Sequence, residues 1–121
     1  MGVYVSVRGW LECDDRQLVR IREIVDTRAA GRSYGGGWVF PPRQYNWTNW
    51  VFFGADVREQ NVDGILTEMR LLARVPGADE EDPVTGLFLV SHETGGMHEW
   101  QVRDGAVVVA PAAPSHDYLD A

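Results

Sequence analysis

The sequence predicts an α+β domain in which two helices cover one face of an antiparallel sheet. Three observations predict this fold. The elements follow the order β-α-β-β-α-β-β-β, the strands alternate or form short apolar runs, and each helical segment carries one apolar stripe. The first six elements match the ferredoxin-like βαββαβ arrangement, and a C-terminal hairpin extends it. With 121 residues, 45% of them hydrophobic, the chain is long enough to form one core.

The first strand and the first helix follow from local patterns. Over residues 3–8, valines alternate with polar or aromatic residues, so we expect a half-buried strand with the valines facing the core. Asp14 or Asp15 can cap the following helix, and Gln17 stands three residues after Asp14, as in a capping box. Apolar residues at helical spacing then predict a helix from residue 15 to residue 30.

The middle of the chain predicts two more strands and a second helix. Short strands are expected at residues 38–40 and 50–57, the first of them stopped by the proline pair that follows it. Asn61 can cap a helix that Pro76 ends. Its apolar residues fall on one stripe, namely Ile65, Leu66, Met69, Leu72 and Val75.

A hairpin of residues 87–93 and 97–103 is predicted around Gly95-Gly96 as a two-residue turn. That register pairs Glu93 with His98 and His92 with Glu99 on opposite faces, so one site cannot use all four side chains. Cross-strand polar pairing is favoured over a metal or acid-base site, and any chemical role of either pair stays open. The same register assigns a core-facing side to Leu87, Leu89, Trp100 and Val102.

The end of the chain predicts one more turn and strand. Asp104-Gly105 is typical of a tight turn, and an apolar strand follows at residues 106–110. One domain therefore covers residues 1–110. Residues 111–121, rich in proline, alanine and acidic side chains, are predicted to lie loosely on the surface.

The charge balance narrows the class of partner. The chain has 11 basic and 18 acidic residues, a net charge of −7, and every basic residue is arginine. A domain with a pI of about 4.8 lacks the basic surface that phosphate backbones require, which argues against a nucleic-acid partner and favours a basic protein. The absence of lysine also removes P-loop and Schiff-base chemistry, and no cofactor is predicted.

Cys13 is the only cysteine, which excludes a disulfide framework and a multi-cysteine zinc site and is typical of a reducing cytoplasm. The neighbouring Asp14 and Asp15 disfavour its thiolate, so we expect a structural thiol.

No apolar run is long enough for a membrane span, and the first residues do not resemble a signal peptide. We therefore expect a cytoplasmic protein.

Aromatic residues are unusually frequent, with five Trp, four Tyr and four Phe. Tyr4, Arg8 and Trp10 share the strand face opposite the valines, where either loops cover the rings or the rings anchor a partner. An acidic loop at residues 79–82 could steer a basic protein. The candidate partner-binding residues are Trp10, Arg43, Tyr45, Trp47, Trp50, Asp79, Glu80, Glu81 and Asp82.

The segment Val7-Arg8-Gly9-Trp10-Leu11-Glu12, followed by an acidic helix start, resembles bacterial polymorphic-toxin immunity proteins. The resemblance covers about the first 25 residues. It implies a cytoplasmic, non-enzymatic antidote that binds one cognate toxin and blocks its active site or a nearby surface. It does not identify which residues of this chain bind the toxin. Two alternatives stay open. One is a self-assembling or regulatory interaction module, with a homodimer formed through the aromatic face. The other is a small hydrolytic or metal-dependent enzyme that uses His92, Glu93, His98 and Glu99.

Overall fold

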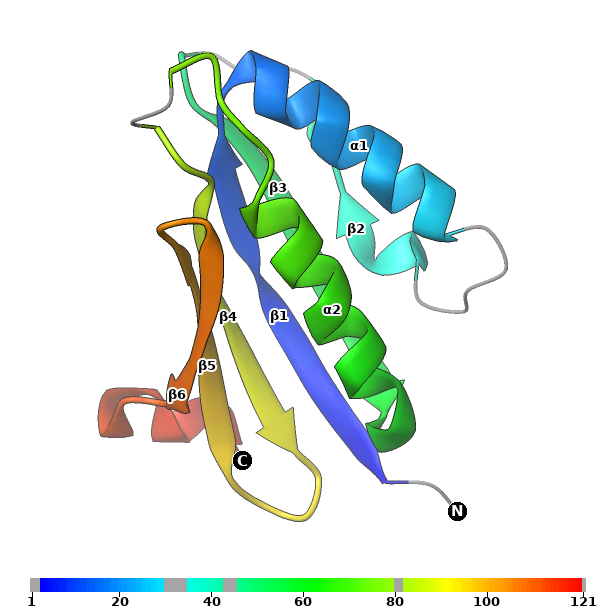
Figure 1. Cartoon of the computed structure of the whole chain (residues 1–121). Helices are drawn as coiled ribbons and strands as arrows, with labels where there is room; N and C mark the ends of the chain where they lie inside the picture. The colour runs from blue at the N-terminus through cyan, green and yellow to red at the C-terminus, as the bar shows by residue number, and fades with distance from the viewer. Residues whose placement is uncertain (1–2, 30–34, 43–45, 80–81, 121) are drawn as a thin grey trace.

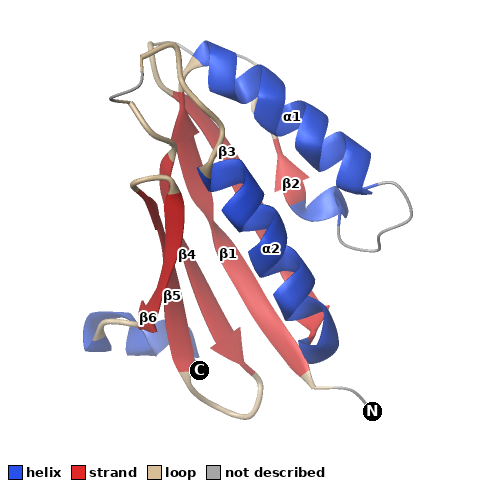
Figure 2. Ribbon diagram, in the orientation of Figure 1, coloured by secondary structure: helices blue, strands red, loops and turns tan. Residues whose placement is uncertain are grey.

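The computed structural model describes residues 3–29, 35–42, 46–79 and 82–120. Six strands form one antiparallel sheet, and both α-helices lie on the same face of it (Figures 1 and 2), so the predicted α+β class is confirmed. The helices are α1 (Asp15–Ala29) and α2 (Val62–Ala73). The strands are β1 (Tyr4–Cys13), β2 (Trp38–Val39), β3 (Asn49–Arg58), β4 (Thr85–His92), β5 (Met97–Arg103) and β6 (Ala106–Pro111).

The strand order is β2-β3-β1-β4-β5-β6. The ten-residue β1 lies in the interior of the sheet and pairs antiparallel with β3 on one side and β4 on the other. The complete order is not that of a four-stranded ferredoxin-like sheet, because β5 and β6 continue beyond β4. One edge is therefore the two-residue β2 and the other is the six-residue β6.

The core lies between the sheet and the two helices. The prediction that the β1 valines face the core is confirmed, since Val5 and Val7 are fully buried. The apolar stripe of α2 is buried at Ile65, Met69 and Leu72, as the helical spacing predicts. Alternate residues of each strand point away from this core, so the arrangement of the core also determines which side chains reach the opposite face.

The capping box at the start of α1 is confirmed, with Asp14 as the cap. The backbone N–H of Asp14 donates to Gln17 Oε1 at 2.8 Å, and the backbone N–H of Gln17 donates to Asp14 Oδ1 at 2.7 Å. Gln17 is almost fully buried, and its Nε2 also donates to the carbonyl oxygens of Val75 and Asp82. The helix start is thereby tied to the loop between α2 and β4.

The predicted two-residue turn at Gly95-Gly96 is wrong. The connection is a three-residue loop at residues 93–95, in which His92 donates to Gly96 O at 3.1 Å and Gly95 donates to His92 O at 2.9 Å. Gly95 takes the left-handed conformation, with φ 104°, that ends such a loop. Glu93 follows the last residue of β4, its backbone N–H donates to Tyr4 O of β1, and its carboxylate accepts from the Tyr4 N–H.

This turn shifts the β4–β5 register and reverses the predicted faces. His98 lies opposite Val90 and Glu99 lies opposite Leu89, so the predicted His–Glu pairs do not form. The shift is an odd number of residues, which exchanges the two sides of one strand relative to the other. Trp100 and Val102 do face the core, with Trp100 opposite Phe88 and Val102 opposite Gly86. The assignment of Leu87 and Leu89 to the core side is wrong, since both lie on the opposite face.

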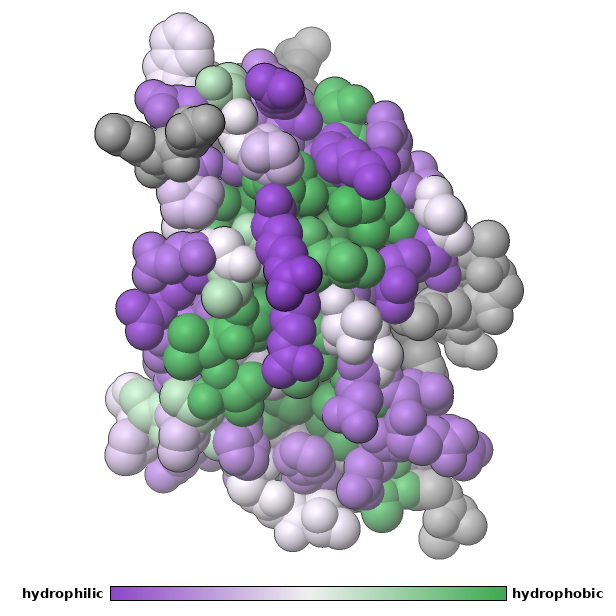
Figure 3. All heavy atoms as spheres, viewed as in Figure 1, coloured by the Kyte–Doolittle hydropathy of each residue, from purple (hydrophilic) through white to green (hydrophobic). Residues whose placement is uncertain are grey.

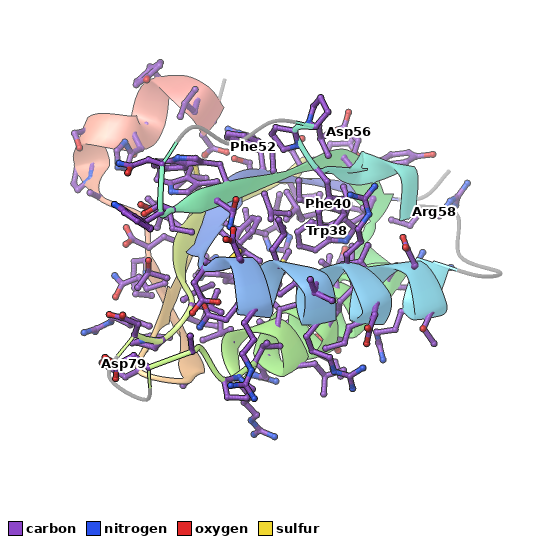
Figure 4. All side chains as sticks on the ribbon, turned by 90° about the horizontal axis from the view of Figure 1, so that it is seen from above. Trp38, Phe40, Phe52, Asp56, Arg58 and Asp79 are labelled. Atoms are coloured by element: carbon purple, nitrogen blue, oxygen red, sulfur yellow. The ribbon has the colours of Figure 1, made fainter. Side chains whose placement is uncertain are left out.

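The chain end turns at Asp104-Gly105, as predicted, with positive φ values of 54° and 74°. β6 follows, and residues Pro114–Asp120 then form the 3₁₀ helix η3. For this last segment, where a loose tail is predicted, the structure has Arg8 Nη2 of β1 donating to Leu119 O at 2.8 Å. η3 thus lies on the sheet face that α1 and α2 leave uncovered (Figure 4).

Candidate functional site

The sheet face opposite α1 and α2 is the candidate site, and we call it the open face. Figure 4 shows Phe52 and Asp56 on the side of β3 turned away from α1, whereas Trp38 lies between the sheet and the helix. Trp50 and Phe52 keep about 40% of their surface exposed on this face. Large exposed aromatic side chains on a sheet are typical of a surface that binds another molecule.

η3 divides the open face into two parts. It packs against β4, and just before it Ala113 donates its backbone N–H to Glu99 Oε1 at 3.3 Å. In the same region the buried hydroxyl of Ser91 has no hydrogen-bond partner in the described part of the chain. Tyr4 and Phe52 also stay exposed on this face, and the end at which β1 stops, at Cys13, is the part that carries hollows beside Trp10 and Trp47.

Two adjoining hollows occupy that end, and we call them the acidic hollows. The larger has a volume of about 420 Å³ and lies over β1, β4 and β5, and the smaller, of about 280 Å³, lies beside the loops that precede β3 and β4. Glu12 and Thr85 line both hollows and so join them. Trp10 lines the larger hollow and Trp47 lines the smaller one.

Carboxylates dominate the charge of the acidic hollows. Glu12 and Glu99 line the larger hollow, and Asp14 and Asp82 line the smaller one. Arg103 is the one cationic side chain among the lining residues that the structure describes. Concave, partly desolvated walls of one charge sign strengthen the local field, so this end of the open face attracts cations.

Hydrogen bonds hold several of these carboxylates in place. Trp10 Nε1 donates to Glu12 Oε2 at 3.3 Å, and Gln101 Nε2 donates to Glu99 Oε2 at 2.7 Å. The carboxylate of Asp14 is used for folding, because it accepts from the backbone N–H groups of Gln17 and Ala78. Glu12 and Glu99 are therefore oriented by neighbours on the open face and still present their charge to the larger hollow.

The structure brings several of the predicted site residues together. Trp10 and Trp47 line the two acidic hollows, and Trp50 lies opposite Glu12 in the β1–β3 ladder on the same face. Asp82 lines the smaller hollow and donates its N–H to the carbonyl of Asp79, which is exposed. The predicted contacts Arg43, Tyr45, Glu80 and Glu81 lie outside the described residues.

Trp47 is the most exposed large hydrophobic side chain that the structure describes, at 88%. The strand that follows it is anchored two residues later, where Asn49 is buried and its Nδ2 donates to Asp15 Oδ1 at 2.8 Å. An indole that is exposed on a well-anchored segment can bury a large area on binding with little loss of conformational entropy.

Glu12, Thr85 and Glu99 belong to the site but were not predicted as partner-binding residues. Glu12 carries a detectable signal, because it stands two residues after Trp10 and therefore shares its strand face. Thr85 and Glu99 carry none, because their position depends on the β1–β4 and β4–β5 registers. The predicted hairpin register gave Glu99 a different neighbour.

Cys13 borders the smaller hollow but is itself a buried thiol. Burial, together with the nearby carboxylates of Asp14 and Asp15, raises the pKa of this thiol to about 12. A thiol with this pKa is a neutral, poor nucleophile near pH 7. The geometry therefore agrees with the structural role expected for Cys13.

The two histidines of the β4–β5 hairpin lie on the helix-covered side of the sheet, away from the acidic hollows. Their rings meet edge to face, with centroids 6.1 Å apart. In the described residues, no group of three or more His, Cys, Asp or Glu side chains is arranged to hold a metal ion. The pair His92 and His98 is thus separated from Glu99, which lies on the open face.

The chain matches no family model, no curated protein and no solved structure. Among the described residues, neither α-helix has the length and apolar character needed to cross a bilayer.

Proposed function

We propose that this protein is an immunity protein that binds and occludes a cognate bacterial toxin domain. The observation that carries the proposal is the placement of Trp10 and Trp47 at two adjoining hollows that are lined by carboxylates, the larger over the open face and the smaller at the end of β1 beside the start of α1. Aromatic anchors beside oriented charges are the residue types that dominate tight protein interfaces. The Gly-Trp strand that resembles immunity proteins contributes one of these two anchors.

The proposed mechanism is occlusion without catalysis. The indole of Trp47 packs into an apolar recess of the toxin, while Glu12 and Glu99 accept hydrogen bonds from its arginine or lysine side chains. The net charge of −7 accelerates the encounter with a basic toxin, and the acidic hollows fix the orientation of the complex. A toxin whose active site is lined by cationic side chains is the partner that this surface complements.

The proposal places the protein in the bacterial cytoplasm, where an antidote meets a toxin that has entered the cell. A single buried thiol and no disulfide suit that reducing compartment.

For the fold, we propose a ferredoxin-like βαββαβ unit extended by β5 and β6. The neighbour order β2-β3-β1-β4 supports this relationship. A crystal structure that placed β1 at an edge would contradict it.

The test begins with the gene next to this one. The small C-terminal domain of any large secreted protein encoded there is expressed with this chain, and calorimetry measures the affinity of the complex. We expect Trp47→Ala to weaken binding about 30-fold or more, which corresponds to about 2 kcal/mol. Val19→Ala, an exposed apolar position on α1, is the control and should leave the affinity unchanged.

A charge variant tests the acidic hollows separately. Glu12→Gln should slow association and reduce its dependence on salt, because the removed charge attracts the partner. Glu23→Gln, on the exposed surface of α1, is the matched control. A complex whose affinity is insensitive to both Trp47→Ala and Glu12→Gln would exclude the open face as the binding surface.

A further inference from the structure

The outer edge of β6 is unpartnered and unusually apolar. β6 is the last strand in the sheet order, and no described strand lies beyond it. Its sequence, Ala-Val-Val-Val-Ala-Pro, contains no charged residue. Val108 is 38% exposed on the open face and Val109 is 47% exposed on the helix-covered side. Figure 3 shows apolar atoms gathered over β6 beside α2.

The two edges of the sheet differ in how they are protected. β2 is only two residues long and is followed closely by Pro41 and Pro42, so it offers little backbone to another strand. β6 has six residues, and its ladder with β5 runs from Arg103↔Ala106 to His98↔Pro111 without a bulge. An uncharged apolar edge without a bulge is the kind of surface that pairs with another strand.

The turn before β6 determines which backbone groups point outward. Asp104 and Gly105 form a two-residue turn, so the flanking pair Arg103 and Ala106 is a hydrogen-bonded pair, and the pattern alternates from there. Val108 therefore points its N–H and C=O toward β5. Val107 and Val109 point theirs outward, toward the empty edge.

We propose that β6 pairs antiparallel with β6 of a second copy of this chain, so that the two sheets join across a two-fold axis. When Val108 faces the second copy's Val108, the outward groups of Val107 meet those of the second copy's Val109, and the reverse pair forms as well. Each copy then supplies both donors and acceptors. Valine side chains meet on both faces of the joined sheet, which covers the surface that Val108 and Val109 expose.

The same register explains the proline at the end of β6. Pro111 has no N–H to donate, and it falls opposite the second copy's Gly105, where that strand has already turned. Asp104 falls opposite the second copy's Ala112, so no like charges meet in the ladder. A strand that is complementary to itself in hydrogen bonding and charge fits a second copy better than it fits the basic partner proposed for the acidic hollows.

The proposed interface is small. One strand pair alone buries less than the roughly 1,200 Å² typical of stable complexes, so the dimer should be concentration-dependent. It also leaves the acidic hollows free, because β6 lines neither of them. The inference therefore stands independently of the proposed function.

Sedimentation equilibrium of the full chain, from about 1 µM to about 1 mM, tests the proposal. We expect the mass to rise from 13.6 kDa toward twice that value. Val109→Lys places a charge on the free edge and should keep the protein monomeric over the same range. Val39→Lys places the same charge at a 54% exposed position on the opposite edge and should dimerise like the parent. Circular dichroism establishes that both variants are folded.

Three results would overturn the proposal. The parent chain could stay monomeric up to about 1 mM, Val109→Lys could dimerise like the parent, or Val39→Lys could be as monomeric as Val109→Lys. A monomeric parent whose toxin binding is lost in Val109→Lys would assign the edge to a foreign strand instead. The proposed function fails on a different measurement, the insensitivity of toxin binding to Trp47→Ala and Glu12→Gln.

Discussion

The two faces of the sheet are built from the same strands and do different work. Toward α1 and α2, β1 and β3 present valines and Phe53, and these side chains are almost completely buried. Toward the open face, the alternate positions of the same strands present Trp10, Trp50 and Phe52 beside carboxylates. A strand that alternates in this way separates the residues of the core from those of the open face, because adjacent residues belong to different surfaces.

Charged groups on the two faces differ in the same way. On the covered face, the buried carboxylate of Glu68 accepts from Trp38 Nε1 at 3.0 Å and lies 3.4 Å from Arg28 Nε. A buried charge requires such partners. On the open face, Glu12 accepts from Trp10 Nε1, and Glu99 accepts from Gln101 Nε2 and from the Ala113 N–H, and both carboxylates still line a hollow. The carboxylate of the covered side is thus buried with its partners, and those of the open face border a hollow.

The largest expected effect compares a buried ring with an open-face ring. Phe88 is fully buried, so Phe88→Ala should lower the free energy of unfolding by about 3–5 kcal/mol through lost burial and a cavity. Phe52→Ala removes the same side chain from the open face and should cost about 1 kcal/mol or less. Urea denaturation measures both. Equal losses would show that the open face also belongs to the core.

Gln17 connects the start of α1 to the loop beside the smaller hollow, and its substitution tests how much this connection stabilises the fold. Its side chain caps α1 and donates to Val75 O and Asp82 O beside the smaller hollow, so Gln17→Leu leaves buried carbonyls unsatisfied. We expect a loss of about 2–3 kcal/mol in urea denaturation. Gln60→Leu, at an exposed position, is the control and should stay within about 0.5 kcal/mol of the parent. If both variants matched the parent, the capping network would have no energetic role.

Alkaline pH probes the boundary of the core at Cys13. Its pKa rises from 9.0 to about 12 on folding, so the folded state favours the neutral thiol. The contribution of the neutral thiol to the free energy of unfolding is complete below pH 9 and is lost as the pH rises toward 12. At pH 10 the loss is of the order of 1 kcal/mol. Cys13→Ala has no thiol to ionise, so its melting temperature should fall less at alkaline pH than that of the parent. The raised pKa also predicts that the native thiol is alkylated slowly at pH 8.

The smallest expected effect on stability is at Trp47. Because its side chain is 88% exposed, Trp47→Ala should change the free energy of unfolding by no more than about 0.5 kcal/mol, although it removes the largest side chain in the protein. The same substitution should strongly weaken the proposed toxin binding, so its effects on stability and on binding should differ most at this residue. A melting temperature several degrees lower would assign Trp47 to the core.

Local chemistry made much of the fold predictable. The capping box of Asp14 and Gln17, the valine alternation of β1 and the turn at Asp104-Gly105 each depend on a few neighbouring residues, and each is confirmed. The hairpin before β5 was not predictable in this way. Two consecutive glycines are compatible with both a two-residue and a three-residue loop, so the local residues do not distinguish the two loops.

The candidate site was predictable only in part. Trp10 was placed on the correct side of β1 by alternation alone. Its neighbours in the larger hollow, Thr85 and Glu99, come from strands far along the chain, so their arrangement depends on long-range register. Trp47 was marked by its residue type, but its extreme exposure depends on where the loop before β3 leaves the sheet.

The inner position of β1 has a consequence for synthesis. β1 is the first strand to leave the ribosome, but its two neighbours are β3, at residues 49–58, and β4, at residues 85–92. Its valines therefore stay without their final covering until most of the chain has emerged. Folding that depends on such distant pairings is slow, and the nascent chain remains open to aggregation meanwhile. Chaperones that hold apolar segments should therefore engage the N-terminal strand of this protein before its open face exists.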